Sequence, residues 1–331
     1  MMSKPWLLIP SQLGHILSPF FLKAYGRIRR YQTLTWKPFT WKNLEFTNPL
    51  GLAGGFDKNA EMIESFWTLG ASFVEIGTVT PLPQKQNSGP VIGRSLPHQA
   101  LWNQLGFPSK GVEYVTKKLA RFRQPHFTPI FINIGKNRHT DLTLASQDYI
   151  SLIQKLSKYA DAFVINISSP NTPQLRDLLE PKSLKQFLDP IIGVNKNLLH
   201  KPLLLKISPD VDDATLLSIL DVSADCGIDG WILTNTTVQR TEGMKFPATG
   251  GVSGKPLREK SKHFLKLTVA HLQKTQKNRG DFLIISVGGI MTPQDVQERL
   301  ELGADLVQVY SSLVFDGPFF FQKVYKTIRH L

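Results

Sequence analysis

This chain of 331 residues lacks several features that would place it in common protein classes. Its single cysteine, Cys226, excludes an intramolecular disulfide framework and reads as a buried helix-end thiol. Its eight histidines are scattered, without an HExxH pair or zinc-spaced cluster, so we expect no metal. No apolar run reaches the roughly 18 residues of a membrane-spanning helix. No GxGxxG motif follows an apolar strand, which disfavours a Rossmann-type nicotinamide site.

Acidic residues are missing from the first part of the chain. Residues 1–44 contain no Asp or Glu but carry Lys4, Lys23, Arg27, Arg29, Arg30, Lys37 and Lys42. Apolar residues between Leu13 and Tyr31 recur at steps of three to four, which is typical of one helical face. Ser18-Pro19 reads as an N-cap followed by proline at the first helical position, so we expect two short helices. We interpret residues 1–44 as an amphipathic segment that lies on an anionic lipid surface.

Other interpretations of this segment stay open. An Arg-rich, acid-poor start is also typical of a mitochondrial transit peptide, and the helices could instead only cap the main domain. A secretory signal is disfavoured because Pro10, Gly14 and Pro19 interrupt the apolar stretch. The net charge of +13 raises nucleic acid as a partner, but no RNP, zinc-finger or helix-turn-helix signature supports it. We therefore expect no nucleic-acid partner.

From residue 45 onward, short apolar strands alternate with longer amphipathic stretches. The expected strands are Leu50–Gly54, Phe73–Thr78, Ile130–Ile134, Phe163–Ile167, Leu203–Ile207, Trp231–Thr234, Leu283–Val287 and Leu306–Tyr310. Expected helices include Ala60–Leu69, Tyr149–Tyr159, Asp213–Cys226, Lys260–Gln276 and Pro293–Leu302. Eight such units predict an α/β fold, a (β/α)8 TIM barrel over residues 45–331 with a small N-terminal helical extension at 1–44. Residues 81–107, rich in Pro and Gly, read as an inserted loop or hairpin layer over the barrel mouth.

Polar residues and glycines follow the expected strands, where a barrel enzyme places its site. They are Gly54-Gly55-Phe56-Asp57-Lys58, Gly77-Thr78, Asn133, Asn166 with Ser169, Lys206, Thr234-Asn235-Thr236, Gly288-Gly289 and Tyr310-Ser311. The run from Asn166 to Pro173 follows a buried strand with two amides and three hydroxyls, which suits a flat, polar, anionic substrate. Taken alone, that run also fits an Asx or Ser turn.

The glycines and one lysine indicate a cofactor. Gly288-Gly289, Tyr310-Ser311 and Gly254 could present backbone N–H groups to a phosphate, although each glycine alone also fits a tight turn. Lys206 ends an apolar strand and needs an anion facing it, because an unpaired buried ammonium is costly. FMN meets both needs, since a lysine beside N1 and the C2 carbonyl stabilises negative charge on the reduced ring.

With these residues together, the chain resembles the class 2 (quinone-linked) dihydroorotate dehydrogenases from Asn48 to the C-terminus. The motifs that carry the resemblance are Asn48–Gly54, Glu75–Pro81, Ile132–Asn137, Asn166–Pro173, Thr234–Thr237, Thr249–Gly254, Val287–Ile290 and Leu306–Ser311. Class 1 relatives have a cysteine where this chain has Ser169. Class 2 relatives carry an N-terminal helical pair that docks on the membrane and admits quinone, which fits residues 1–44.

The resemblance implies a site and an activity. FMN would contact Ala53, Gly54, Lys58, Thr78, Asn133, Asn166, Lys206, Thr234, Gly254, Gly289, Tyr310 and Ser311. Orotate would be held by Lys58, Asn103, Gln104, Leu105, Gly106, Phe107, Asn166, Asn171, Asn235 and Thr236. Ser169 would remove a proton from C5 of dihydroorotate, helped by Thr172 or a water, while a hydride leaves C6 for FMN. Arg94 aligns with the quinone-headgroup arginine.

The implied role is pyrimidine biosynthesis by a peripheral flavoprotein on the cytoplasmic face of a bacterial inner membrane, or on the mitochondrial inner membrane of a eukaryote. Three positions depart from what is common in relatives: Gln104 stands in place of Arg, Gly54 in place of Ala and Phe56 in place of Leu. Two rival functions stay open: a soluble FMN barrel that uses fumarate, NAD or another pyrimidine, and a basic membrane- or RNA-binding barrel without catalysis.

Overall fold

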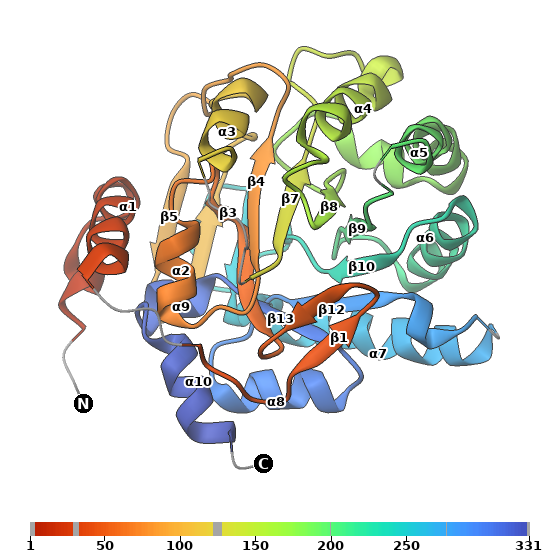
Figure 1. The fold of residues 1–331 in the computed structure, drawn as a ribbon. Coiled ribbons are helices and arrows are strands. Elements are labelled where there is room, and N and C mark those ends of the chain that lie inside the picture. Colours follow the sequence, from red (N-terminus) through yellow and green to blue (C-terminus); the bar gives the residue numbers. More distant parts are fainter. Residues whose placement is uncertain (1–3, 29–32, 122–127, 199, 276, 330–331) are drawn as a thin grey trace.

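The computed structural model describes residues 4–28, 33–121, 128–198, 200–275 and 277–329. Eight parallel strands close into a barrel in the order β3-β4-β7-β8-β9-β10-β12-β13 (Figure 1). Their bounds are β3 Leu50–Asp57, β4 Val74–Val79, β7 Ile130–Ile134, β8 Ala162–Ile165, β9 Leu203–Ile207, β10 Gly230–Leu233, β12 Leu283–Val287 and β13 Leu306–Val309. The predicted (β/α)8 barrel is therefore confirmed.

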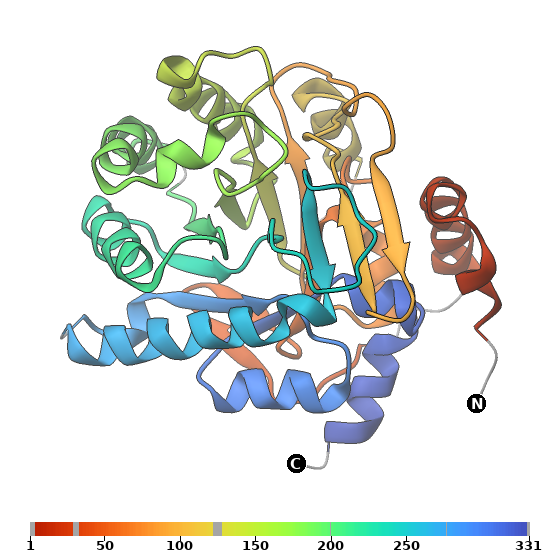
Figure 2. The ribbon, with the colours of Figure 1, turned by 180° about the vertical axis from the view of Figure 1, so that it is seen from behind.

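Helices surround the barrel and cover its outer face (Figures 1 and 2). The α-helices after the first strand of the barrel are α2 Ile63–Leu69, α3 Val112–Leu119, α4 Ala145–Leu156, α5 Pro181–Lys196, α6 Asp213–Cys226, α7 Arg258–Lys274, α8 Pro293–Glu301, α9 Ser311–Phe315 and α10 Phe320–Ile328. Short 3-10 turns are η1 Pro5–Leu8, η2 Leu142–Leu144, η3 Leu175–Leu179, η4 Lys255–Leu257 and η5 Arg279–Asp281. Because the strands are covered on both faces, all four residues of β8 are buried, as an unbroken apolar run requires.

The limits of α6 illustrate how the sequence sets a helix. The Asp212 side chain accepts the N–H of Thr215 at 2.7 Å and caps the first turn. Gly227 adopts φ +106° after the last turn, a conformation that glycine takes at low cost. Cys226 is the last residue of α6 as expected, but it is partly exposed rather than buried.

A two-stranded hairpin closes the N-terminal end of the barrel. It consists of β1 Phe39–Trp41 and β2 Leu44–Phe46. The ring of Phe46 lies 5.7 Å from that of Phe73 and 6.2 Å from that of Phe131, inside the barrel. The hairpin crosses the predicted boundary between residues 44 and 45, so we place the start of the barrel unit before Phe39.

A three-stranded antiparallel sheet covers the mouth, in the order β11-β6-β5 (Figure 2). Strands β5 Ile92–Ser95 and β6 Ala100–Asn103 form the hairpin expected within residues 81–107. The third strand, β11 Gly251–Gly254, comes from the loop after β10 and was not anticipated. Trp102 joins the two parts by donating its indole N–H to the carbonyl of Thr249 at 2.7 Å.

The N-terminal extension contains one α-helix, α1 Ser11–Ile28, with Pro19 inside it. The prediction that Ser18-Pro19 separates two helices is wrong. Proline has no N–H to offer the carbonyl of His15, but the Ser18 hydroxyl donates to that carbonyl at 3.4 Å and the helix continues. Gly26 allows close packing on α2, since a Cβ there would lie 2.7 Å from Cα of Ser65.

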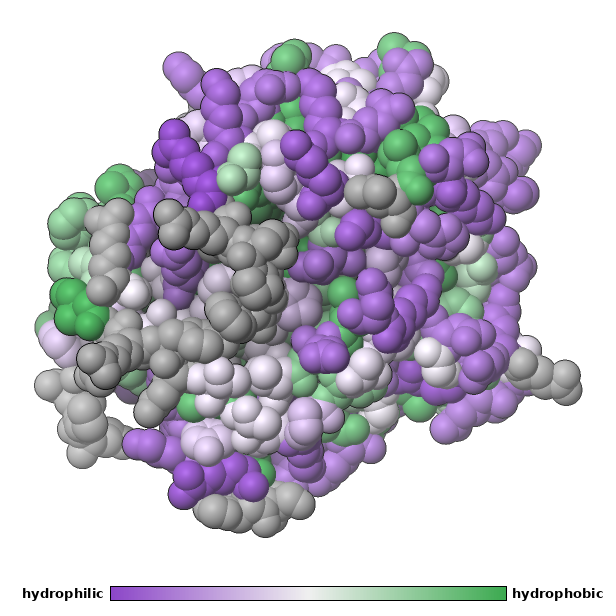
Figure 3. Space-filling view, in the orientation of Figure 1, coloured by the Kyte–Doolittle hydropathy of each residue, from purple (hydrophilic) through white to green (hydrophobic). Residues whose placement is uncertain are grey.

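The outer face of α1 is apolar. Leu13, Ile16, Phe20, Phe21 and Ile28 are 46%, 71%, 70%, 62% and 82% exposed. Figure 3 shows hydrophobic residues at the left edge of the molecule, where α1 lies in Figure 1. Among the described residues, no helix is long and apolar enough to cross a bilayer.

Candidate active site

A cavity of about 850 Å³ lies at the C-terminal ends of the barrel strands and extends to α1. This volume is in the upper part of the range that small-molecule sites occupy. All residues predicted to contact a cofactor line it: Ala53, Gly54, Lys58, Thr78, Asn133, Asn166, Lys206, Thr234, Gly254, Gly289, Tyr310 and Ser311. Ser169, Arg94 and the predicted substrate residues Asn103, Leu105, Gly106, Phe107, Asn171, Asn235 and Thr236 line the same cavity. The fold thus brings together residues from every strand end.

Two predicted residues do not line the cavity. The side-chain oxygen of Gln104 accepts a hydrogen bond from Thr249 at 3.1 Å, so Gln104 ties β6 to the loop before β11. Thr172 is buried, and no hydrogen bond joins it to Ser169 in the part of the chain that the structure describes.

A chain of amides forms the floor of the cavity. Asn166 donates to the hydroxyl of Thr78 at 3.0 Å and to the side-chain oxygen of Asn133 at 3.1 Å. Asn235 donates to the side-chain oxygen of Asn166 at 3.3 Å and to the Ser168 hydroxyl at 3.0 Å. Asn166 and Asn235 thus use both of their N–H groups on neighbouring side chains, which fixes the planes of both amides, and a planar ligand would meet them by replacing one of these bonds.

Glu75 is a buried carboxylate beneath this floor that the sequence reasoning missed. Its Oε1 accepts from Lys206 at 2.8 Å and from Asn133 at 2.6 Å, and its Oε2 accepts from Gln308 at 2.8 Å. The expectation that Lys206 needs an anion was sound, but a side chain of the protein supplies one. A charged residue in the otherwise apolar strand Val74–Val79 was the available signal.

The other cavity lysine, Lys58, follows β3. Burial lowers its pKa to about 8, partly opposed by the negative charge of Asp57. Asp57 itself is turned toward backbone N–H groups, accepting from Glu61 at 2.9 Å and Met62 at 2.7 Å. Among the described residues that line the cavity, Lys58 is therefore a cation that is free to meet an anionic ligand.

Glycine-containing turns form the opposite wall. Gly254 and Gly289 adopt φ of +92° and +71°. A Cβ at Gly254 would lie 2.2 Å from the carbonyl of Gln99, and one at Gly289 would lie 2.2 Å from Cα of Arg258. Beside them the hydroxyls of Ser253 and Ser311 lie 3.0 Å apart. Backbone N–H groups and hydroxyls gathered in this way are typical of a phosphate site.

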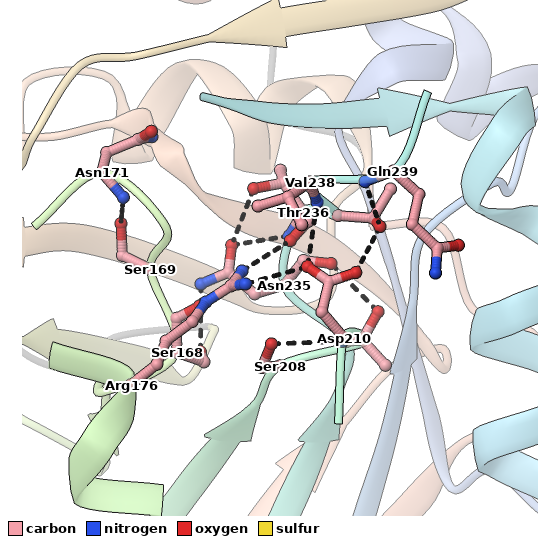
Figure 4. Close-up of polar contacts among 12 residues, drawn as sticks. Ser168, Ser169, Asn171, Arg176, Ser208, Asp210, Asn235, Thr236, Val238 and Gln239 are labelled. Atoms are coloured by element: carbon pink, nitrogen blue, oxygen red, sulfur yellow. Dashed lines mark hydrogen bonds and ion pairs between the residues drawn. The ribbon is translucent and has the colours of Figure 1, made fainter. Parts of the chain in front are cut away.

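Ser169 follows β8 and is buried at the cavity wall (Figure 4). Its Oγ accepts the backbone N–H of Asn171 at 3.2 Å, which orients the hydroxyl. Asn171 also donates to the side-chain oxygen of Asn103 at 2.9 Å, while its own side-chain oxygen is buried without a partner. Ser169 and Asn171 both line the cavity, so the hydroxyl and the unpaired oxygen could each meet a ligand there.

An ion pair behind Ser169 ties three loops together (Figure 4). Arg176 donates to the carbonyl of Ser168 at 3.0 Å, to the carboxylate of Asp210 at 2.9 Å and to the carbonyl of Thr236 at 3.1 Å. Asp210 accepts in turn from the hydroxyl of Thr237 at 2.5 Å and the backbone N–H of Val238 at 2.9 Å. The loops after β8, β9 and β10 therefore share one anchor, which sequence reasoning also missed.

At its far end the cavity reaches α1. His15 lines it, and burial together with the charge of Lys58 lowers the pKa of His15 to about 4, so the ring is neutral at pH 7. Arg94 donates to the carbonyls of Leu7 at 2.8 Å and Ile9 at 2.6 Å, so it holds the segment that precedes α1. Leu17, Phe21 and Leu22 complete an apolar wall.

The family model described as "Dihydroorotate dehydrogenase" matches residues 38–331. A Nautilia profundicola protein named "Dihydroorotate dehydrogenase (quinone)" is 41% identical over 83% of this chain and 74% of its own length. A Sulfurimonas denitrificans protein of the same name is 40% identical over 95% of this chain and 89% of its own. The structure titled "Crystal structure of DHODH in complex with ferulenol from Eimeria tenella" superposes with a TM-score of 0.84 at 32% identity, covering 95% of this chain and 89% of that one.

Replacing Asp210 with Asn should destabilise the protein. The Arg176 and Asp210 side chains are only 23% and 10% exposed, so the change leaves a largely buried guanidinium without its counter-charge. We expect a loss of about 1–3 kcal/mol in the free energy of unfolding, measured by urea titration. Asp189→Asn, which breaks an exposed pair with Lys185, should cost less than about 0.5 kcal/mol. Equal costs for the two variants would contradict the anchoring role.

Proposed function

The chain belongs to the dihydroorotate dehydrogenase family, and we propose that it oxidises dihydroorotate to orotate with FMN as cofactor and a membrane quinone as electron acceptor. It is a dihydroorotate:quinone oxidoreductase of pyrimidine biosynthesis. One observation carries the proposal: a single cavity joins the amides and lysines of the barrel mouth to the apolar inner face of α1. Such a cavity gives a polar substrate and an apolar acceptor access to one cofactor.

The residues present fit FMN. Gln308 lines the cavity, and its side-chain oxygen is a buried acceptor without a partner, which suits a ring N–H. Among the described residues Glu75 is the only acceptor that Lys206 meets, so the ammonium keeps donors for a ligand. The turns at Gly254, Gly289 and Ser311 suit the phosphate. When bound, FMN accepts a hydride from dihydroorotate and delivers the electrons to quinone.

Dihydroorotate would lie on the amide floor. A pyrimidine-dione alternates N–H and C=O groups, and an asparagine amide offers both a donor and an acceptor. The unpaired side-chain oxygen of Asn171 can accept one ring N–H, and Asn166 and Asn235 would meet other edges by exchanging a bond to a neighbouring side chain for one to the ligand. Lys58 would bind the substrate carboxylate by a charge-assisted hydrogen bond.

Ser169 would act as the base that takes the proton from C5. Its Oγ is oriented by the N–H of Asn171 and is buried from bulk water. A hydroxyl is a weak base, so the proton must pass onward. Thr172 keeps that predicted role only through a bridging water, because no hydrogen bond between described atoms joins the two hydroxyls.

Quinone would enter between α1 and the barrel, past Leu17, Phe21 and the neutral His15. Arg94 lines this end, although its guanidinium also holds the carbonyls of Leu7 and Ile9. The exposed apolar face of α1 supports peripheral binding to an anionic lipid surface, on the cytoplasmic face of a bacterial inner membrane, or on the mitochondrial inner membrane in a eukaryote.

The purified protein should be yellow, and dihydroorotate added without oxygen should bleach its flavin absorbance. A long-chain quinone should then restore the colour, whereas fumarate and NAD should not. Absorption spectroscopy with this panel of acceptors checks the assigned cofactor, substrate and electron acceptor together. A colourless protein after reconstitution with FMN would contradict the proposal.

Ser169→Ala should keep FMN bound but slow its reduction by dihydroorotate by about two to four orders of magnitude, the usual worth of a positioned base. Anaerobic stopped-flow absorbance measures this rate. Ser157→Ala removes a buried hydroxyl at the end of α4 and should leave the rate unchanged. A near-normal rate in Ser169→Ala would mean that another group removes the C5 proton of dihydroorotate.

Orotate affinity should fall as the pH rises through about 8. Burial lowers the pKa of Lys58 to about 8, so the ammonium that binds the carboxylate is present below that pH and is lost above it. Orotate binding followed by the flavin absorbance between about pH 6 and pH 9 measures the effect, up to about tenfold per pH unit. Lys58→Arg keeps its charge throughout and should abolish the dependence. A flat profile in the unmodified protein would contradict this role of Lys58.

Deleting residues 1–32 should abolish vesicle binding and quinone turnover while dihydroorotate still bleaches the flavin. The deletion stops before Leu34 and Trp36, which are buried against the barrel. In the full-length protein, Ile16→Ser with Phe20→Ser should weaken vesicle binding measured by co-sedimentation, because both side chains lie on the exposed face. Full quinone turnover by the truncated protein would show that α1 only covers the barrel and is not needed for quinone access.

A further inference from the structure

Gly54 in β3 faces Glu75 in β4, and its missing side chain makes room for the carboxylate. A Cβ built on Gly54 would lie 2.1 Å from Oε1 of Glu75 and 2.7 Å from its Cδ. Gly54 does not adopt a positive φ, unlike Gly55 at +92°, so its backbone conformation is open to any residue. What glycine supplies at position 54 is therefore space for a carboxylate.

Glu75 acts on the cavity from behind its wall. Its side chain is fully buried and is not among the residues that line the cavity. Its three hydrogen-bond donors, Lys206, Asn133 and Gln308, all line the cavity. Glu75 can therefore affect a ligand through these three side chains and through the field of its charge but not by direct contact, which makes Glu75 a positioning residue.

The strongest of these contacts is electrostatic. The ammonium of Lys206 lies 2.8 Å from Oε1 of Glu75, and both side chains are shielded from water. In such surroundings a carboxylate at contact distance cancels much of the field that the ammonium would exert on a nearby ligand. A ligand in the cavity would therefore meet the N–H donors of Lys206 but would experience only part of the positive charge of its ammonium.

We propose that Glu75 sets the reduction potential of bound FMN. The flavin ring gains negative charge on reduction, and Glu75 weakens the stabilisation of that charge by Lys206. Gly54 leaves the space that lets the carboxylate reach the ammonium. This inference rests on the proposed function, since it requires FMN beside Lys206. It predicts that weakening the Glu75–Lys206 contact raises the potential. A more oxidising flavin accepts a hydride faster and gives electrons to quinone more slowly.

Glu75→Gln is the direct test because it removes the charge and keeps the shape. A glutamine oxygen can still accept from Lys206 and Asn133. Its new N–H group would face the N–H group of Gln308, so the variant loses this one hydrogen bond while the Gln308 oxygen stays available to FMN. The variant is therefore expected to fold and to bind FMN.

Gly54→Ala is the second test because it keeps every charge. The added Cβ displaces the carboxylate from its contact with Lys206. We expect both variants to shift the midpoint potential of the holoenzyme to more positive values, measured by anaerobic titration against redox dyes. In stopped flow, reduction by dihydroorotate should be several times faster and reoxidation by quinone several times slower. A loss of structure alone would slow both half-reactions.

Two controls isolate the cause. Glu113→Gln removes one negative charge from an exposed side chain and should leave the potential unchanged. In a Lys206→Met background, adding Glu75→Gln should produce a smaller shift than in the unmodified protein, because the part of the effect that passes through the lysine is gone. A full shift in that background, an unchanged potential in Glu75→Gln or Gly54→Ala, or a shift to more negative values overturns the inference. Bleaching of the unmodified enzyme by dihydroorotate tests the proposed function separately.

Discussion

The ion pair between Glu75 and Lys206 is the constraint around which the mouth of the barrel is organised. Two charges removed from water are stable only when each is paired and its remaining hydrogen-bonding capacity is used. Asn133 and Gln308 supply the further donors to the carboxylate, and Gly54 supplies the space. Strands β3, β4, β7, β9 and β13 thus contribute to one buried cluster, and the ligand-facing amides are oriented by it.

The outer part of the site depends on a different anchor. Arg176 and Asp210 hold the backbone of the loops after β8, β9 and β10, so Ser169 and Asn235 are held in a fixed relation to each other. On the other side, Arg94 holds the segment before α1 against the mouth sheet. The polar floor and the apolar entrance are therefore positioned independently, which suits two substrates of opposite character that share one cofactor.

The barrel and most of its site could be predicted from the sequence because both depend on local patterns. Apolar strand runs alternate with helices, and strand ends in a parallel barrel must meet at one rim. Three features escaped that reasoning, one because a local side-chain hydrogen bond offset a helix breaker and two because they depend on tertiary packing. The hydroxyl of Ser18 allows α1 to continue through Pro19, β11 pairs with β6 across nearly 150 residues, and the β1–β2 hairpin belongs to the barrel core. Gln104 also lies outside the cavity because it pairs with a distant residue, Thr249.

The sequence by itself determined the class of fold, the rim on which the chemistry lies and the need of Lys206 for a counter-charge, because hydrophobic periodicity and the cost of burying an ammonium are local properties. Only the tertiary structure decided that Glu75 supplies that charge, that Arg176 anchors the substrate loops, and that α1 closes one continuous cavity. These outcomes depend on which side chains meet after the barrel closes. A pairing between residues 131 positions apart, such as Glu75 and Lys206, leaves no local trace in the sequence.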